Sequence, residues 1–389
     1  MDPHVALIRC PDYDPAAVET AVRRAVDLLG GMGRFVRPGQ RVLVKPNLLL
    51  PTHPDGAIVT HPAVVRAVVL LVQEAGGRVL IADNPGVSTI HYAWRRAYER
   101  TGLAAVAAET GAELNTEIVA VQRPYPDGHL IKAVDTCTFV TEADVIISLP
   151  KLKTHGLVRY TGAVKNLFGT IPGLIKPGYH IKLQTAEQFS EMLLDLAGFV
   201  HPALTVMDAV VGMDGDGPSA GRPFPIGAVL AGTDPTAVDV AAVALVDHDP
   251  AAMPTIAAAV RRGWTTGRAA DLAIVGDDPG LTGWDLLAAL RVSGFQMQPG
   301  GQGALLPNLP GFLRSWSARS IVARPVVSER CIGCGVCIAN CPAQTIAKVD
   351  DRARIDPAGC IYCYCCHELC PEQAIDLRRP LMSRILMHL

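Results

Sequence analysis

Short apolar runs alternate with longer amphipathic stretches over the first 290 residues of this 389-residue chain. The short runs are rich in β-branched residues and suit buried strands, whereas the longer stretches carry apolar residues at helical spacing. The predicted strands are Val5–Arg9, Arg41–Lys45, Arg78–Ala82, Ala143–Leu149, Leu204–Asp208, Ile226–Ala231 and Leu272–Val275. The predicted helices are Pro15–Leu29, Pro62–Ala75, Ala186–Phe199, Thr236–Val246 and Ala251–Arg262.

Several of these helices are expected to begin next to a proline that follows a polar residue, as at Asp14-Pro15 and His61-Pro62. Proline is favoured in the first turn of a helix because the N–H that it lacks would be unpaired there anyway. Strands and helices that alternate in this way predict an α/β body, with a mostly parallel sheet and helices on both faces.

Polar or glycine-rich segments follow five of the predicted strands. They are Pro46-Asn47, Asp83–Gly86, Pro150–His155, the stretch from Asp208 to Gly221, and Gly232–Pro235. Ligands of open α/β sheets bind outside the carboxyl ends of the strands. If the sheet is parallel, all five segments meet at one edge and form a binding rim.

Lysine is scarce in this chain but clustered, because five of its 8 lysines fall between Lys151 and Lys182. Lysine ammonium groups bind carboxylates and phosphates. We therefore favour an anion site over a solvated basic loop. The predicted substrate-binding residues are Lys45, Asn47, Lys165, Asn166 and Asp208, and the predicted catalytic residues are His155, Lys153 and Lys151. His155 would act as a general acid, because imidazole changes charge near neutral pH.

Composition excludes several classes of protein. The net charge is −2 with 19% charged residues, so no basic excess indicates nucleic-acid binding. No run of about 18 uncharged apolar residues could span a membrane. The amino terminus lacks the basic segment and apolar core of a secretory signal. We expect a cytoplasmic protein.

The glycine-rich stretch from Gly212 to Gly221 matches no nucleotide-binding motif. A Walker loop would continue into Gly-Lys-Ser/Thr, and a dinucleotide fingerprint would lead into a helix. No NAD or flavin motif is visible. Asp208, Asp214 and Asp216 could hold a divalent cation through their carboxylate oxygens, or could simply form an acidic turn.

Eight of the eleven cysteines form two runs of one spacing, C-x2-C-x2-C-x3-C-P, that are 29 residues apart. This is the spacing of a bacterial ferredoxin with two 4Fe-4S clusters, in which the fourth cysteine of each run ligates the other cluster. One cluster would take Cys331, Cys334, Cys337 and Cys370, and the other Cys360, Cys363, Cys366 and Cys341. Zinc knuckles use pairs of cysteines and would leave the third of each run unexplained.

Three differences between the two runs bear on the clusters. Tyr362 and Tyr364 stand where the first run has Gly333 and Gly335. Their rings could shield that cluster from water. Cys365 lies out of register, and a buried free thiol is favoured over a ligand because the regular frame is already complete.

These patterns divide the chain into four parts. Residues 1–290 form the α/β body, and the glycine- and proline-rich residues 291–325 form a linker. Residues 326–378 form a small α+β ferredoxin-like domain. Residues 379–389 are a basic amphipathic tail. Packing of this tail on the body is favoured, although it could also make peripheral membrane contact.

Several segments resemble one family along nearly the whole chain. They are VLVKPNLL, THPAVVRAVVLLVQEAGGRVLIADNPG, LPKLKTHGLVRYTGAVKNLFGTIPG and MDAVVGMDGDGPSAG…GTDPTAVDVAA. The chain is similar to the domain of unknown function 362 family, which is often fused to two 4Fe-4S motifs. The resemblance implies a cytoplasmic iron–sulfur protein and one common site. That site would contain Lys45, Asn47, Lys151, Lys153, His155, Lys165, Asn166 and Asp208.

Two functions fit these observations. The first is a reductase that passes single electrons from a low-potential ferredoxin-like donor to a small anionic unsaturated substrate at the lysine-rich rim. Lysines would stabilise the negative charge that develops, and His155 or a lysine would supply a proton. The alternative is an electron-transfer or assembly protein that docks a partner enzyme and has no small-molecule substrate of its own.

Overall fold

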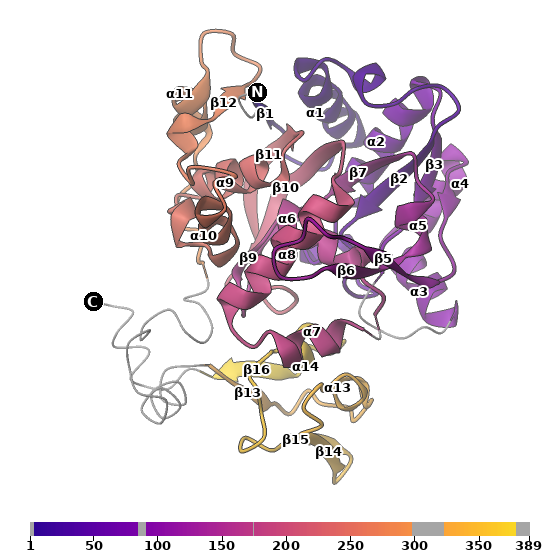
Figure 1. The fold of residues 1–389 in the computed structure, drawn as a ribbon, viewed down its shortest axis with the longest axis vertical. Coiled ribbons are helices and arrows are strands. Elements are labelled where there is room, and N and C mark those ends of the chain that lie inside the picture. The colour runs from indigo at the N-terminus through magenta and orange to yellow at the C-terminus, as the bar shows by residue number, and fades with distance from the viewer. Residues whose placement is uncertain (1–3, 85–90, 174, 298–322, 379–389) are drawn as a thin grey trace.

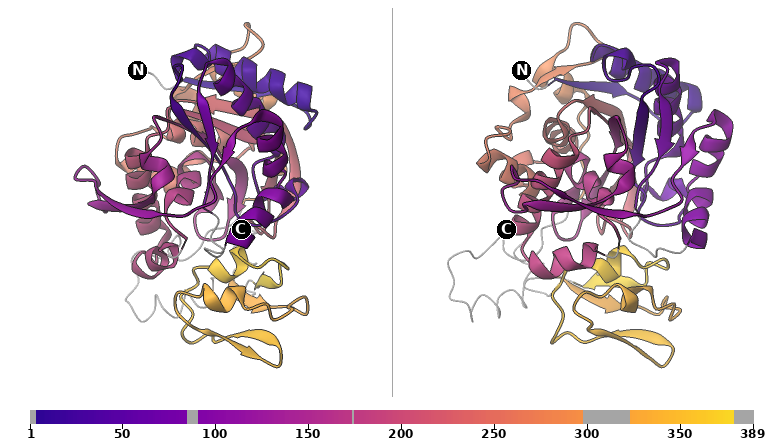
Figure 2. Two further views of the ribbon diagram at one scale, coloured as in Figure 1. Left: turned by 90° about the vertical axis from the view of Figure 1, so that its right-hand side faces the viewer. Right: turned by 45° about the vertical axis from the view of Figure 1, so that its right-hand side comes forward.

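The computed structural model describes residues 4–84, 91–173, 175–297 and 323–378. A large α/β body holds most of the chain, and the cysteine-containing segment, drawn in yellow, lies against one side of it (Figures 1 and 2). The tail and most of the expected linker lie outside the described residues. In the described part, no helix is long and apolar enough to cross a membrane.

The strands of the body form one mixed sheet with the order β12-β1-β11-β10-β7-β2-β3-β4, to which β8 and β9 attach beside β10. Its strands are β1 His4–Arg9, β2 Arg41–Pro46, β3 Arg78–Ile81, β4 Glu113–Leu114, β7 Val145–Leu149, β8 Lys151–His155, β9 Arg159–Thr161, β10 Leu204–Asp214, β11 Arg222–Gly232 and β12 Ala273–Val275. A separate antiparallel pair, β5 Ala120–Pro124 and β6 Ala133–Cys137, forms a hairpin.

Three features of the sheet correct the predicted rim. First, β11 runs antiparallel to both β10 and β1, so the segment Gly232–Pro235 lies at the opposite end of the sheet from the other four. Second, Lys151–His155 is not a loop but strand β8, which pairs with β10 and β9. Third, β10 continues past Asp208 to Asp214, and a turn leads directly into β11. The glycines between Asp214 and Arg222 therefore belong to the turn of a β-hairpin.

The five predicted helices form within three residues of their predicted bounds, as α1 Pro15–Leu28, α2 Pro62–Glu74, α8 Ala186–Val200, α9 Pro235–Leu245 and α10 Pro254–Arg261. The body also contains helices outside this predicted set, which are α3 His91–Arg100, α4 Leu103–Thr110, α5 Thr138–Thr141, α6 Ala163–Asn166, α7 Lys176–Lys182 and α11 Gly283–Leu290. Asp14 and Asp234 cap α1 and α9 by accepting backbone N–H bonds, and each is followed by proline.

Alternate side chains of the central strands pack on opposite faces of the sheet. Val42 and Val44 of β2 belong to the apolar cluster formed with α1 and α2. Leu43, between them, belongs to the cluster formed with α8 on the other face. All three are fully buried. The structure confirms an α/β fold with a mostly parallel sheet and helices on both faces.

The cysteine-containing segment consists of two copies of one structural unit. Its elements are β13 Arg324–Val327, α13 Val336–Ala339, β14 Ile346–Val349, β15 Arg352–Ile355, α14 Cys365–Glu368 and β16 Ile375–Arg378. Helix α14 lies 29 residues after α13, and β16 lies 29 residues after β14. Gln344 and Gln373, at matching positions, both adopt positive φ. The repeat in the sequence is therefore also a repeat of the backbone.

Candidate functional site

A pocket with about 800 Å³ of empty space lies where the body meets the cysteine-containing segment. We call it the junction pocket. Helices α7 and α14 lie next to each other at this boundary (Figures 1 and 2). The polar residues of the body that line the junction pocket are Asn47, Asp83, Asn84, Lys153, Thr161, Lys165, Asn166, Lys176 and His180. The cysteine-containing segment contributes Asn340, Cys365, Glu368 and Leu369.

The structure brings together only part of the predicted rim. Asn47, Lys153, Lys165 and Asn166 line the junction pocket, and they come from three different segments of the body. The remaining predicted residues, Lys45, Lys151, His155 and Asp208, are not among its lining residues. Each of these four makes close contacts elsewhere, which decide what it can do.

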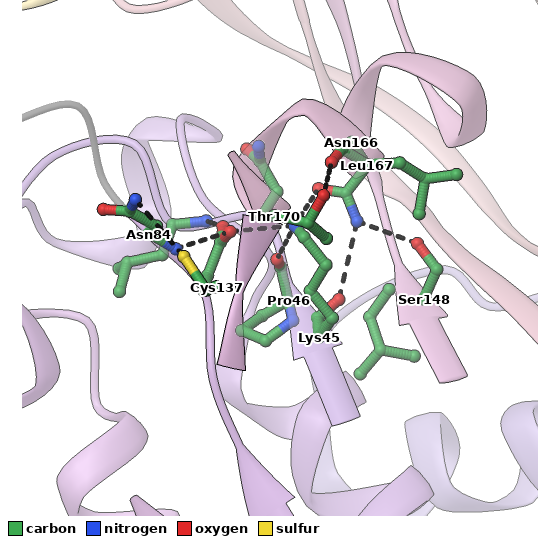
Figure 3. Close-up of polar contacts among 12 residues, drawn as sticks. Lys45, Pro46, Asn84, Cys137, Ser148, Asn166, Leu167 and Thr170 are labelled. Carbon is green, nitrogen blue, oxygen red and sulfur yellow. Dashed lines mark hydrogen bonds and ion pairs between the residues drawn. The ribbon is translucent and has the colours of Figure 1, made fainter. Parts of the chain in front are cut away.

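Lys45 does not line the pocket itself but contacts two residues that do, Asp83 and Asn166. Its fully buried ammonium forms an ion pair with Asp83, with Nζ 2.8 Å from Oδ1. Figure 3 shows Asn166 held between Lys45 and Ser148: the Asn166 amide donates to the Ser148 hydroxyl at 2.9 Å, and Lys45 donates to Asn166 Oδ1 at 3.4 Å. Burial lowers the pKa of Lys45, whereas Asp83 opposes the shift.

Glycine is required beside this ion pair. A Cβ atom on Gly169 would lie 2.0 Å from Asp83 Oδ1 and 2.6 Å from Lys45 Nζ. Two atoms cannot approach so closely, and the pair is buried with little room to move. The backbone at Gly169 therefore packs directly against the two charges.

Lys151 and Asp208 form a second ion pair, and neither residue lines the junction pocket. Lys151 Nζ lies 2.9 Å from Asp208 Oδ2, and the Tyr13 hydroxyl contacts both residues. The His61 backbone N–H also donates to Asp208. Both charged side chains are fully buried and satisfied. Neither residue lines the junction pocket, so the structure does not support Lys151 as a catalytic residue or Asp208 as a substrate-binding one.

The predicted divalent-cation site is not formed. Asp208 is paired with Lys151, and Asp214 accepts two hydrogen bonds from Arg222, at 2.7 and 3.0 Å. In the described residues, no three His, Cys, Asp or Glu side chains gather closely enough to hold a metal ion. The acidic turn, which the sequence allowed as the alternative, is the better description.

Three lysines face the junction pocket, and their amines differ in their contacts. Lys153 donates to the backbone carbonyl of Ile58 at 2.6 Å, and burial followed by the charge of Lys165 lowers its pKa well below 10.5. Lys176 donates to the Asn84 carbonyl, and burial lowers its pKa to about 8. Lys165 forms no hydrogen bond or ion pair with any described residue. Burial lowers its pKa as well.

His155 contacts the backbone that follows it and a carboxylate of α14. Its Nδ1 accepts backbone N–H bonds from Leu157 at 3.0 Å and Val158 at 3.3 Å, so the proton of the neutral ring is on Nε2. Nε2 lies 2.9 Å from Oε1 of Glu368, although the angle departs from that of a straight hydrogen bond. Burial lowers the pKa of His155 to about 4. The ring is therefore neutral at pH 7 and directed at Glu368, which does not support a general acid acting on a ligand.

Sequence reasoning missed four residues of the pocket. Lys176 belongs to the lysine cluster, but its role could not be told from spacing. His180 is 6% exposed and stacks on Phe189, and its Nδ1 has no partner among the described residues. Cys365 and Glu368 reach the pocket only because α14 docks on the body, and no local signal in the sequence predicts that contact.

The second cysteine run faces the body, and its two tyrosines make the contact. Tyr362 and Tyr364 are buried in the apolar cluster of α8. A Cβ atom on Gly156 would lie only 3.1 Å from the Tyr364 ring. Both tyrosines adopt positive φ, at 55° and 63°, where side chains are strained. The rings pack between this run and the body, and their shielding of a cluster from water stays a prediction.

The cysteines fit iron–sulfur clusters. Burial, together with the nearby Cys370, Cys334 and Cys331, raises the pKa of the Cys337 thiol to about 11. These four cysteines also line one cavity. Burial also raises the pKa of Cys366, with contributions from Cys363, Cys360, Cys337 and Cys341. Each neighbourhood contains the four cysteines that the crossed spacing rule assigns to one cluster.

Backbone donors also surround the sulfur atoms. N–H groups point at Cys370, Cys331, Cys341 and Cys360 at 3.2 to 3.4 Å. Hydrogen bonds of this kind stabilise the thiolate form that binds iron. A 4Fe-4S cluster takes one cysteine for each iron, so its ligands surround the cluster and need not converge on one ion.

Comparison with known proteins agrees with both parts of the chain. Residues 42–244, more than half of the chain, match the family described as Domain of unknown function (DUF362). The chain belongs to the DUF362 family. Residues 326–371 of this DUF362 protein match the 4Fe-4S dicluster domain. The chain therefore carries an iron–sulfur ferredoxin domain of the kind that transfers electrons.

Individual relatives of this DUF362 protein are similar over different lengths. It is 36% identical over 262 residues to thylakoid-associated protein sll1697 of Synechocystis sp., which covers 67% of this chain and 79% of the relative. It is 40% identical over 52 residues to the protein named Ferredoxin 7Fe of Hydrogenibacillus schlegelii, which covers 13% of this chain and 67% of that one.

A solved structure is also similar. The apoprotein of lactate racemase from Thermoanaerobacterium thermosaccharolyticum aligns with 59% of this chain at 15% identity and a TM-score of 0.36. The chain spans about half of that structure, 54% of its length.

Proposed function

We propose that this DUF362 protein is an iron–sulfur reductase that takes single electrons from a low-potential, ferredoxin-like donor and reduces a small anionic unsaturated molecule in the junction pocket. One observation carries the proposal. The pocket is lined on one side by Lys153, Lys165 and Lys176, and on the other by Cys365 and Glu368 of α14. The same helix contains Cys366, which is one of the cluster ligands that we assign.

We assign two clusters with crossed ligands. Cys331, Cys334, Cys337 and Cys370 would hold the outer cluster, and Cys360, Cys363, Cys366 and Cys341 the inner cluster. Cys334 is exposed, which suits entry of electrons from a donor. The second run lies against the body under Tyr362 and Tyr364, which suits delivery toward the pocket. Iron-bound thiolates favour a reducing compartment such as the cytoplasm.

The residues of the pocket suit the reduction of a conjugated double bond. The clusters, when bound, supply two electrons one at a time, and two protons complete the saturated product. The ammonium groups would stabilise the negative charge that develops on the substrate. Lys165, whose amine has no other partner among the described residues, is best placed to give one proton, and solvent would supply the other. His155 would hold Glu368 in place beside the pocket.

Reoxidation of the reduced protein tests this function. The protein would be purified without oxygen, reduced with dithionite, freed of excess reductant and mixed with fractions of small metabolites while the cluster absorbance is followed. We expect one fraction to reoxidise the wild type quickly. Lys165→Met should slow that reaction at least about tenfold, the equivalent of roughly 1.4 kcal/mol. Lys182→Met, on the exposed end of α7 and outside the pocket, is the matched control.

A second function is favoured by one observation. Ile332, next to the outer cysteines, is 66% exposed, and such a side chain suits a protein contact. An electron-transfer or assembly protein without a small substrate would be reoxidised only by a protein fraction. If every small-molecule fraction fails and a protein fraction succeeds equally well with wild type and Lys165→Met, the reductase proposal is wrong and this alternative is supported.

A further inference from the structure

Two of the cations in the junction pocket lie near one aromatic side chain. Lys165 Nζ lies 5.9 Å from the ring centroid of Phe168, and Lys176 Nζ lies 5.7 Å from the same centroid. Lys165 comes from α6 and Lys176 from the first residue of α7. All three side chains line the pocket. The two charges therefore reach the pocket from different elements and share one apolar neighbour.

Neither ammonium has an anionic partner at ion-pair distance in the described part of the chain. The lining contains two carboxylates, Asp83 and Glu368. Asp83 pairs with Lys45 at 2.8 Å and accepts N–H bonds from Leu48 and Asn84. Glu368 faces His155. Both carboxylates thus have closer partners, and they act on the two lysines only from beyond ion-pair distance, Glu368 on Lys165 and Asp83 on Lys176.

Lys153 does not take the place of a third anion-binding group. Its amine donates to the Ile58 carbonyl, and burial with the charge of Lys165 lowers its pKa well below 10.5. Lys176 also donates to a backbone carbonyl, that of Asn84, but it shares the Phe168 ring with Lys165. Burial lowers the pKa of both Lys165 and Lys176, and the opposite charges of Glu368 near Lys165 and Asp83 near Lys176 offset this cost only in part. An anion bound at each lysine would remove that cost.

Apolar side chains form part of the wall around the two cations. Leu48, Leu49, Phe168 and Leu369 all line the pocket. A spacer of carbon atoms fits such surroundings, whereas a polar spacer would lose its hydrogen bonds to water. A ligand with one acid group would leave one lysine unpaired.

We infer that the junction pocket binds a molecule with two acidic groups joined by a short unsaturated carbon spacer, with one acid at Lys165 and the other at Lys176. This inference rests on the proposed function and specifies its substrate class. It also assigns the charge specificity to two lysines, of which Lys176 was not among the residues predicted from sequence.

Matched pairs of acids test the inference by binding alone. The probes are fumarate and crotonate, muconate and sorbate, and terephthalate and benzoate, each pair being a diacid and a corresponding monoacid. Calorimetry with the anaerobic, cluster-loaded full chain measures the affinity of each. We expect at least one diacid to bind about tenfold or more tightly than its monoacid, a difference of roughly 1.4 kcal/mol. At pH 8.5 its binding should take up protons, because the acids raise the pKa of the two lysines.

Variants decide whether these lysines are responsible. Lys165→Met and Lys176→Met should each reduce the affinity for the diacid to about that for the monoacid, while Lys182→Met leaves both unchanged. Lys165→Gln and Lys176→Gln repeat the test if a methionine variant loses its clusters or its circular dichroism. The inference is wrong if no diacid binds more tightly than its partner, or if Lys182→Met has the same effect.

The outcomes separate this inference from the proposed function. A diacid that binds in a lysine-dependent way but never reoxidises the reduced clusters supports the binding site and contradicts the reductase. Reoxidation by a monoacid, with no preference for diacids, supports the reductase and overturns the two-acid site.

Discussion

Nε2 of His155 lies 2.9 Å from Oε1 of Glu368, and this contact joins strand β8 of the body to helix α14 of the ferredoxin domain. The residues are 213 positions apart in the chain. The His155 side chain is fully buried and that of Glu368 is 12% exposed. The contact therefore links the region where we place the inner cluster to the wall of the junction pocket.

Removing the carboxylate should weaken this junction. Glu368→Ala leaves the buried His155 N–H without a partner, which costs about 1–3 kcal/mol. We expect the free energy of unfolding, measured by urea denaturation, to fall by that amount. Glu372→Ala, at an exposed position of the same domain, should change it by less than about 0.5 kcal/mol. Equal effects of the two variants would contradict the role of the contact.

Tyr364 should show two opposing contributions to stability. Its ring is buried, but its φ of 63° is strained for any residue except glycine. Tyr364→Ala loses the packing of the ring and keeps the backbone strain. Tyr364→Gly also loses the packing, but it is relieved of the strain because glycine tolerates positive φ. We expect the glycine variant to be more stable than the alanine variant by about 1 kcal/mol in urea denaturation.

The repeat provides the control for that comparison. Gly335 occupies the matching position of the first run at a φ of 80°, and a Cβ atom added there would have nothing within 4 Å. Gly335→Ala should therefore cost about 1 kcal/mol through backbone strain alone. A much smaller cost at Gly335 would show that strain does not explain the difference at Tyr364.

Cys365 and Cys366 should differ in iron binding although they are adjacent. Our ligand assignment uses Cys366 and leaves Cys365 as a pocket-lining thiol. Cys365→Ser should keep the full iron content, whereas Cys366→Ser should lose roughly half of it, because one of two clusters loses a ligand. Iron analysis and electron paramagnetic resonance of the reduced protein check both. Loss of a cluster in Cys365→Ser would contradict the ligand assignment that we derive from the cysteine spacing.

Gly169→Ala should be strongly destabilising. The added Cβ would force apart Lys45 and Asp83, and breaking a buried ion pair costs about 3–5 kcal/mol. Gly178→Ala is the matched change in α7, where nothing lies within 4 Å of a new Cβ. Alanine is the better helix former there and should stabilise by up to about 1 kcal/mol. Thermal unfolding of both variants measures the contrast.

Asp239 should give stability a particular pH dependence. Its buried carboxyl group accepts N–H bonds from Ala163 and Val164 at the start of α6, and burial raises its pKa to about 7 from 3.8. Between these values the folded state keeps a proton that the unfolded state loses, so stability falls as pH rises. Asp239→Asn removes this titration. From pH 5 to pH 7 the wild type should therefore lose at least about 1 kcal/mol more than the variant.

Urea denaturation at pH 5, 6, 7 and 8 tests this sign. Tyr160→Phe removes only the hydroxyl that donates to Asp239 and should keep the pH dependence. A wild type and Asp239→Asn variant with parallel pH profiles would show that Asp239 keeps its ordinary pKa.

Local patterns in the sequence were sufficient for the elements and the cysteine frame. The predicted strand Arg41–Lys45 and helix Pro62–Ala75 match β2 and α2 to within a residue, because apolar period and helix-start residues act over a few positions. The spacing from Cys331 to Cys341 likewise needs no distant contact, since one tight turn presents the thiols. The alternation of strands and helices along the chain predicted helices on both faces of the sheet.

Only the tertiary structure decided which polar residues form the site. Lys151 and Lys165 look alike in the sequence, yet Lys151 pairs with Asp208 and Lys165 has no such partner among the described residues. Likewise, His155 faces Glu368, and β11 reverses direction beside β10. These outcomes depend on burial and on partners far away in the chain, and residue spacing carries no information about either. The sequence therefore determined the elements and the iron–sulfur frame, whereas the packing of body and ferredoxin domain decided where a ligand can bind.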